Sequence, residues 1–211
     1  MSDEKLFQEI YKIDGSTKLY MVEIALDQYT DIFSEWDPAP FKRRSIDPDL
    51  ELYLEGSSEE IPVRYPVELY FTIPTGTHNQ MLEDEVRYGL RNSFMFKLYL
   101  IRKELRKTNV LMLRYSVFGF LFLATAKLFS SRLPEESWLT LITEALFIGG
   151  WVFVWEAVSL FFFSNREIYG RYQIYKRLRN APVIFQEVDR SRSRSESLAN
   201  AARTHDRQET L

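Results

Sequence analysis

The sequence predicts an α+β membrane protein: a two-helix transmembrane hairpin inserted into a small cytosolic α+β domain, with long amphipathic juxtamembrane helices on both sides of the hairpin. Three observations lead to this prediction. Residues 110–130 and 138–164 are apolar over a length that crosses a bilayer, short segments outside them alternate between apolar and polar residues, and basic residues are concentrated beside the apolar stretches.

The composition excludes several classes of functional site. The chain has 211 residues, no cysteine and only two histidines, His78 and His205. Disulfides and cysteine nucleophiles are therefore excluded, and a histidine-based metal cluster or catalytic triad is not expected. No glycine-rich phosphate loop, nucleophile elbow or dinucleotide fingerprint occurs. We expect a non-enzymatic protein with no cofactor and no metal site.

The net charge of −3 is unevenly distributed along the chain. Residues 1–78 carry 16 acidic and 7 basic side chains, whereas residues 79–110 and 166–180 together have a net charge of +7. The predicted order is an acidic cytosolic domain (1–78), an amphipathic connector helix (79–109), transmembrane helix 1 (110–130), a short external loop (131–137), transmembrane helix 2 (138–164), a basic juxtamembrane helix with a possible strand (165–188) and a disordered tail (189–211).

Alternating segments predict the strands of the cytosolic domain. Apolar side chains recur at every second position in residues 19–26 and 63–73, which is typical of strands with one buried face. Residues 182–188 are a possible third strand, and if this strand joins the same sheet, the segments before and after the hairpin form one domain. The faces expected to be buried are Tyr20, Val22, Ile24 and Leu26, and Val67, Leu69, Phe71 and Ile73.

Helices are expected between and beyond these strands. A short helix is expected at residues 27–35, and another is expected to open with Asp47 as N-cap and Pro48 at its first position. From residue 80 to 108, apolar residues recur at steps of three or four, which predicts an amphipathic helix that runs into the first transmembrane helix. Residues 165–180 predict a matching helix after the second. Because the first of these helices runs without a break into the first transmembrane helix, it could transmit motion of the cytosolic domain to the membrane. Packing of the helix against that domain explains its apolar periodicity equally well.

Both chain ends are predicted to be cytoplasmic, with the protein in the cell (inner) membrane as a multi-pass protein. Basic residues precede the first apolar stretch and follow the second, whereas the connecting loop has one arginine against two glutamates. The N-terminus has no basic segment followed by an apolar one, so no cleavable signal peptide is expected. The alternative is a soluble protein with two buried core helices, which the basic flanks and aromatic ends disfavour.

Four ionisable residues interrupt the apolar stretches: Arg114 and Lys127 in the first, and Glu144 and Glu156 in the second. Their depths from the loop predict two antiparallel ion pairs, Lys127 with Glu144 and Arg114 with Glu156. The two glutamates lie about 120° apart around their helix, however, so both cannot face one neighbour. Two alternatives stay open. One glutamate faces an identical subunit or a water-filled lumen, as in a cation pathway, or the glutamates are protonated and face lipid.

Glycines interrupt both apolar stretches. Gly119 lies in the first stretch and the pair Gly149 and Gly150 in the second. Small residues allow helices to approach closely, so packing or a mild kink is expected. The alternative is a gating hinge at the glycine pair.

The most distinctive soluble stretch is Trp36-Asp37-Pro38-Ala39-Pro40-Phe41, which is followed by Lys42, Arg43 and Arg44. Each residue before a proline is disfavoured in a helix, so this stretch is expected to be extended. We expect an ordered loop pinned by Trp36 and Phe41; the alternative is a docking surface, or an anion site made by the three basic residues. The acidic residues around it lack EF-hand spacing, so solvated helix faces are expected, with a divalent-cation sensor as the alternative.

Two functional classes are consistent with these features. The first is a membrane-anchored protein with a cytosolic sensing or protein-interaction domain. The second is a homo-oligomeric cation channel or membrane-permeabilising effector gated by that domain. The expected partners are the lipid bilayer, identical subunits and possible cytosolic proteins. Nucleic acid is not expected, because residues 181–211 carry five basic and five acidic side chains.

Overall fold

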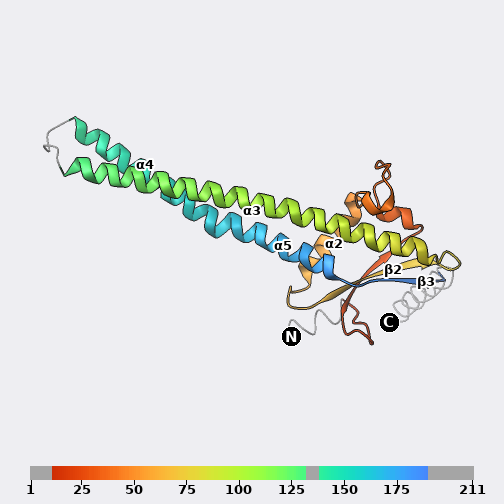
Figure 1. Ribbon diagram of the computed structural model, residues 1–211. Helices are drawn as coiled ribbons and strands as arrows, with labels where there is room; N and C mark the ends of the chain where they lie inside the picture. The colour runs from red at the N-terminus through yellow and green to blue at the C-terminus, as the bar shows by residue number, and fades with distance from the viewer. Residues whose placement is uncertain (1–10, 132–137, 190–211) are drawn as a thin grey trace, which may run out of the picture. The chain divides into compact units, whose positions relative to one another are not determined.

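The computed structural model describes residues 11–131 and 138–189, which form one β-sheet and several helices (Figure 1). Strands β1 (Tyr20–Ala25), β2 (Val67–Pro74) and β3 (Val183–Val188) form a parallel sheet in the order β1-β2-β3. The α-helices are α2 (Pro48–Glu60), α3 (Gln80–Ser130), α4 (Leu139–Ser159) and α5 (Asn165–Asn180). Short 3-10 helices occupy Tyr29–Ile32 and Phe41–Arg43, and a π-helical turn, η3, occupies Leu160–Ser164.

The chain forms two compact units. The first comprises the residues up to Met95 and from Ile174 onward, and the second comprises Phe96–Gln173. We call them the sheet unit and the helix unit. Helices α3 and α5 each contribute to both units.

The sheet contains strands from both sides of the long helical stretch. Val22 pairs with Leu69 between β1 and β2, and Phe71 pairs with Phe185 between β2 and β3. Parallel strands need crossover connections, which α2 supplies between β1 and β2 and which α3, α4 and α5 supply between β2 and β3. The possible third strand therefore forms and joins the same sheet, which is the condition under which the segments before and after the hairpin form one domain; its parallel direction was not predicted.

The buried faces of the first two strands agree with the alternating pattern. Every side chain expected to be buried is less than a tenth exposed, and Val22, Leu69 and Phe71 are fully buried. The face of β2 opposite this core buries Glu68, whose Oε2 accepts a hydrogen bond from the Thr17 hydroxyl at 2.9 Å. Alternation therefore identified the apolar face but gave no sign that a carboxylate on the other face is also buried.

Helices of the sheet unit contact the outer strands. The Tyr53 hydroxyl of α2 donates to the carbonyl of Glu23 in β1 at 3.0 Å. In α3, Arg87 Nε donates to the carbonyl of Val183 at 3.1 Å, and its guanidinium lies 5.1 Å from the ring centroid of Phe185. The start of α3 is therefore fixed to β3, the strand that follows all the long helices.

Two boundaries differ from the sequence prediction, and one helix cap agrees. The second strand begins at Val67 rather than at residue 63, and a 3-10 turn over Tyr29–Ile32 replaces the short helix expected at residues 27–35. Asp47 caps α2 as predicted, because its Oδ1 accepts from the backbone N–H groups of Asp49 and Leu50 at 3.0 and 3.3 Å.

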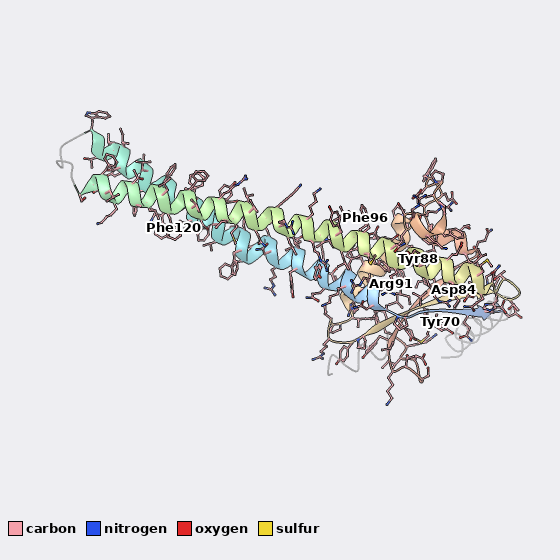
Figure 2. All side chains as sticks on the ribbon, viewed as in Figure 1. Tyr70, Asp84, Tyr88, Arg91, Phe96 and Phe120 are labelled. Carbon is pink, nitrogen blue, oxygen red and sulfur yellow. The ribbon has the colours of Figure 1, made fainter. Side chains whose placement is uncertain are left out.

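The helix unit contains two antiparallel helical segments. The contacts Tyr115 to Phe153 and Asn109 to Asn165 place rising numbers on α3 against falling numbers on α4 and α5. By length and composition, α3 (51 residues) and the stretch Thr140–Asn180 (41 residues) could each span a membrane. Only 11% of the most apolar window of each is buried, and Phe120, labelled in Figure 2, is 68% exposed.

Candidate functional site

Small residues bring α3 and α4 together. A Cβ atom added at Gly119 would lie 2.7 Å from Val154 Cγ2, and one added at Gly150 would lie 2.8 Å from Leu123 Cγ. Gly149 makes only an ordinary contact, 3.7 Å from Phe122. Helix α4 continues through both glycines, and its departure from α-helical geometry comes later, at η3. Gly119 and Gly150 therefore set the distance between the two helices.

Buried small residues define the facing sides of these helices. Thr143, Gly150 and Ala157 are buried at intervals of seven residues on α4, and Gly119 and Ala126 are buried at the same interval on α3. A seven-residue repeat is the spacing of helices that pack along a shared seam. We call these five residues the small-residue seam.

The four charged residues of the apolar helices lie off this seam. All four are exposed, and among the described residues, which include all four, no ion pair joins Lys127 to Glu144 or Arg114 to Glu156. Arg114 precedes Gly119 by five residues, which places it about 140° around the helix from the seam. The expected ion pairs are therefore wrong for the single chain. The depth of a residue along a helix does not show on which side of the helix it lies. The small residues show which side of each helix faces the other.

The loop at residues 36–44 is held by its own polar groups. Asp37 accepts hydrogen bonds from the backbone N–H groups of Ser45 at 2.8 Å and Ala39 at 3.0 Å. These bonds, that from Ser45 first, hold the pKa of the Asp37 carboxyl below its ordinary value. Arg44 Nε donates to the carbonyl of Ala39 at 2.9 Å, and its guanidinium lies 5.3 Å from the ring centroid of Phe41.

The same loop packs on the first turns of α3. Phe41 stacks on Phe33 with ring centroids 5.3 Å apart. Gly89 leaves room for both, because a Cβ atom there would lie 2.8 Å from Phe33 Cζ and would collide with the Phe41 carbonyl oxygen. Asn92 Nδ2 donates to the carbonyl of Lys42 at 2.8 Å, and Ser93 Oγ donates to that of Arg44 at 3.3 Å. The loop backbone is thus bonded to a helix.

Trp36 does not pin this loop, which corrects one of the expectations from sequence. Its side chain is 93% exposed, whereas Phe41, the other expected anchor, packs as predicted. Asp37 and Arg44 form hydrogen bonds within the loop, whereas Lys42 and Arg43 are exposed. Lys42 Nζ lies 3.8 Å from Glu85 Oε1. Trp36, Lys42 and Arg43 are therefore the members of the predicted set that face solvent.

A polar cluster that the sequence did not reveal lies at the start of α3. Glu83, only 2% exposed, accepts from the Tyr29 hydroxyl at 3.1 Å and from Arg87 at 3.0 Å, and its Oε1 lies 2.7 Å from His78 Nδ1. The spacing of His78 and Glu83 near the start of a helix was the available signal. The cluster connects α3 to the segment that follows β1. Tyr29, His78 and Arg87 each contact the Glu83 carboxylate.

A second missed network joins the end of α5 to α2. The Tyr175 hydroxyl lies 2.7 Å from Glu51 Oε1 and 2.9 Å from Glu55 Oε2, and burial raises the pKa of this tyrosine. Arg177 donates to the Ser58 hydroxyl at 2.8 Å and to the carbonyls of Ile61, Pro62 and Tyr65 at 2.9, 3.0 and 3.3 Å. Because Arg177 satisfies three carbonyls beyond the end of α2, it fixes the turn that leads into β2.

No family model, curated protein or solved structure matches this chain. Function is therefore inferred from the chain's own residues.

Proposed function

We propose that the protein is anchored in the cell (inner) membrane by a transmembrane hairpin made of α3 and α4, and that the sheet unit is a cytosolic, non-enzymatic interaction domain. Large apolar side chains on both helices support the hairpin, because contiguous exposed apolar surface of this size is unfavourable in water and favourable in lipid. The basic residues beside the helices support cytoplasmic chain ends by the positive-inside rule.

Trp36 is the observation that carries the proposed interaction role. Trp36 is 93% exposed, and the loop that carries it is fixed to α3 by hydrogen bonds to the carbonyls of Lys42 and Arg44. Tryptophan is among the residues that contribute most to binding when a partner covers them, and an ordered loop loses little conformational entropy on binding. Lys42 and Arg43 are exposed in the same loop, and their positive charges favour a partner with an acidic surface.

The absence of native cysteine makes the membrane orientation directly testable. Single cysteines at Ser131, the first residue of the predicted external loop, and at Ser45, in the sheet unit, would be treated with a membrane-impermeant maleimide in intact cells or spheroplasts. Labelling of position 131 from outside, and of position 45 only after permeabilisation, is expected. Release of the protein from membranes by alkaline carbonate would refute the anchor.

The docking role is tested by cross-linking of the full chain in its native membranes. Trp36→Ala is expected to lower the yield of a cross-linked complex by tenfold or more, as for a hot-spot residue. Leu52→Ala is the matched control, because Leu52 is a large apolar side chain of the same unit that is 71% exposed. Equal yields from the two variants would count against the loop as the docking surface.

One observation favours the second function, a homo-oligomeric cation channel. Glu144 and Glu156 are exposed on the helix unit and form no ion pair within the described part of the chain, so another subunit or a permeating cation is available to them as a partner. Cation flux into liposomes that is lost in Glu144→Gln with Glu156→Gln would support it. A monomer in nanodiscs would exclude it, because two helices do not enclose a pore.

A further inference from the structure

A groove of about 690 Å³ runs along one side of α3, within the helix unit. Each lining residue lies three or four positions from another one, which places them on one side of the helix. They are Tyr99, Arg102, Lys103, Arg106, Lys107, Val110, Leu111 and Arg114.

The groove carries positive charge that is largely uncompensated within the described part of the chain. Five of its eight lining residues are basic and none is acidic. In the described residues, Lys103, Arg106, Lys107 and Arg114 form no ion pair, and the nearby Glu104 is paired with Arg171 at 3.7 Å. Arg102 is partly engaged, because it donates to the Tyr172 hydroxyl at 2.9 Å. The chemistry of the groove therefore favours an anionic ligand.

The groove is also amphipathic along its length. Its basic residues are followed by the exposed apolar side chains of Val110 and Leu111, and then by Arg114, one turn further into the apolar part of α3. From Arg102 to Arg114 the helix rises by about 18 Å. A molecule with a phosphate group at one end and hydrocarbon at the other matches the order of side chains from Arg102 to Leu111.

Arg114 supports a lipid in particular. It lies off the small-residue seam, so its side chain is directed away from the contact with α4. A charged residue inside a bilayer is unfavourable unless its long side chain reaches the interface or finds a counter-charge. Arginine also binds phosphate through two parallel hydrogen bonds, which makes a lipid phosphate a suitable partner.

We propose that this side of α3 is a binding groove for anionic phospholipids, in which Arg106, Lys107 and Arg114 hold the phosphate headgroup and Val110 and Leu111 contact the start of the acyl chain. The proposal rests on the proposed membrane anchor. Beyond the anchor, it states that this side of α3 binds anionic lipids in preference to zwitterionic ones. The lipid phosphate is then the partner of Arg114.

The test uses the full chain in nanodiscs of phosphatidylcholine alone or mixed equally with phosphatidylglycerol. Native mass spectrometry would count retained lipids, and titration with labelled phosphatidylglycerol would give the dissociation constant. The wild-type chain is expected to retain phosphatidylglycerol selectively. Arg106→Gln with Lys107→Gln is expected to weaken binding roughly 25-fold, and Arg114→Gln about fivefold.

Two controls separate a groove from general surface charge. Arg166→Gln with Lys176→Gln removes the same charge from exposed residues outside the groove and is expected to leave phosphatidylglycerol binding unchanged. The exchange Arg106→Lys with Lys107→Arg retains the charges and is expected to retain binding. Labelling of a cysteine at Ser131 verifies that each variant is inserted.

Three outcomes would overturn the groove: equal retention of phosphatidylcholine, equal losses in the groove and control variants, or full competition by soluble glycerol phosphate or RNA. Each of these leaves the anchor intact if the chain resists carbonate extraction. A chain that carbonate extracts would refute the anchor itself, so the two failures are distinguishable.

Discussion

Replacing Gly89 by alanine adds one methyl group where the loop at residues 36–44 packs on α3. In an unhindered helix, glycine to alanine stabilises by about 0.5–1 kcal/mol. At Gly89 the new Cβ would lie 2.8 Å from Phe33 Cζ and would also collide with the Phe41 carbonyl oxygen, which is backbone and cannot rotate away. Overpacking of this kind costs about 1–3 kcal/mol. We expect a net loss of roughly 1–2 kcal/mol in the free energy of unfolding.

The measurement is urea unfolding of the full chain in detergent, followed by near-ultraviolet circular dichroism. Gly56→Ala in α2 is the matched control, because no atom lies within 4 Å of its added Cβ. The control is expected to be slightly more stable than the wild type, and Gly89→Ala less stable with an unchanged m-value. Equal midpoints for the two variants would refute the close contact between the loop and α3.

Three further predictions concern other parts of the chain. Arg177→Gln leaves backbone carbonyls beyond α2 without donors and should lower the free energy of unfolding by about 3 kcal/mol, whereas no loss in urea unfolding would contradict that network. The pKa of the Asp37 carboxyl is lower in the folded protein than its ordinary value. The hydrogen bonds to the ionised carboxylate therefore stabilise the fold fully above the ordinary pKa, and this stabilisation is lost as pH falls through the lowered pKa. Amide exchange at Ser45 should show this loss of protection, and Asp37→Asn should abolish its pH dependence. Gly150→Ala should reduce disulfide formation between cysteines at positions 115 and 153 more than Gly149→Ala does, because only the former brings a Cβ within 3 Å of Leu123.

The periodic parts of the fold were predictable because burial follows simple repeats. Alternation identified the buried faces of β1 and β2, and apolar steps of three and four identified the helix that begins near residue 80. The cap at Asp47 was predictable because its signal is local. The direction of the strands was not predictable in this way, because side-chain alternation is the same in parallel and antiparallel sheets.

The candidate sites were less predictable because they depend on the directions of side chains in space. Arg114 was matched with Glu156 by depth, and the 120° offset of the two glutamates did not show which side of α4 faces α3, whereas the small-residue seam does. Trp36 and Phe41 were expected to pin their loop, but Trp36 is exposed, and the backbone N–H groups that donate to Asp37 help to hold the loop instead. Short-range polar bonding leaves little trace in a hydrophobicity pattern.

The π-helical turn η3 makes the second apolar helix tolerant of a change in length at one place. A π turn accommodates about one residue more than an α-helical turn. Deleting one residue within Leu160–Ser164 would let this turn close into an α-helix, with Ala157 before it and Ile168 after it left on the sides that they now bury. The same deletion within α4 would rotate one end of that helix against the other by about 100° and break the small-residue seam.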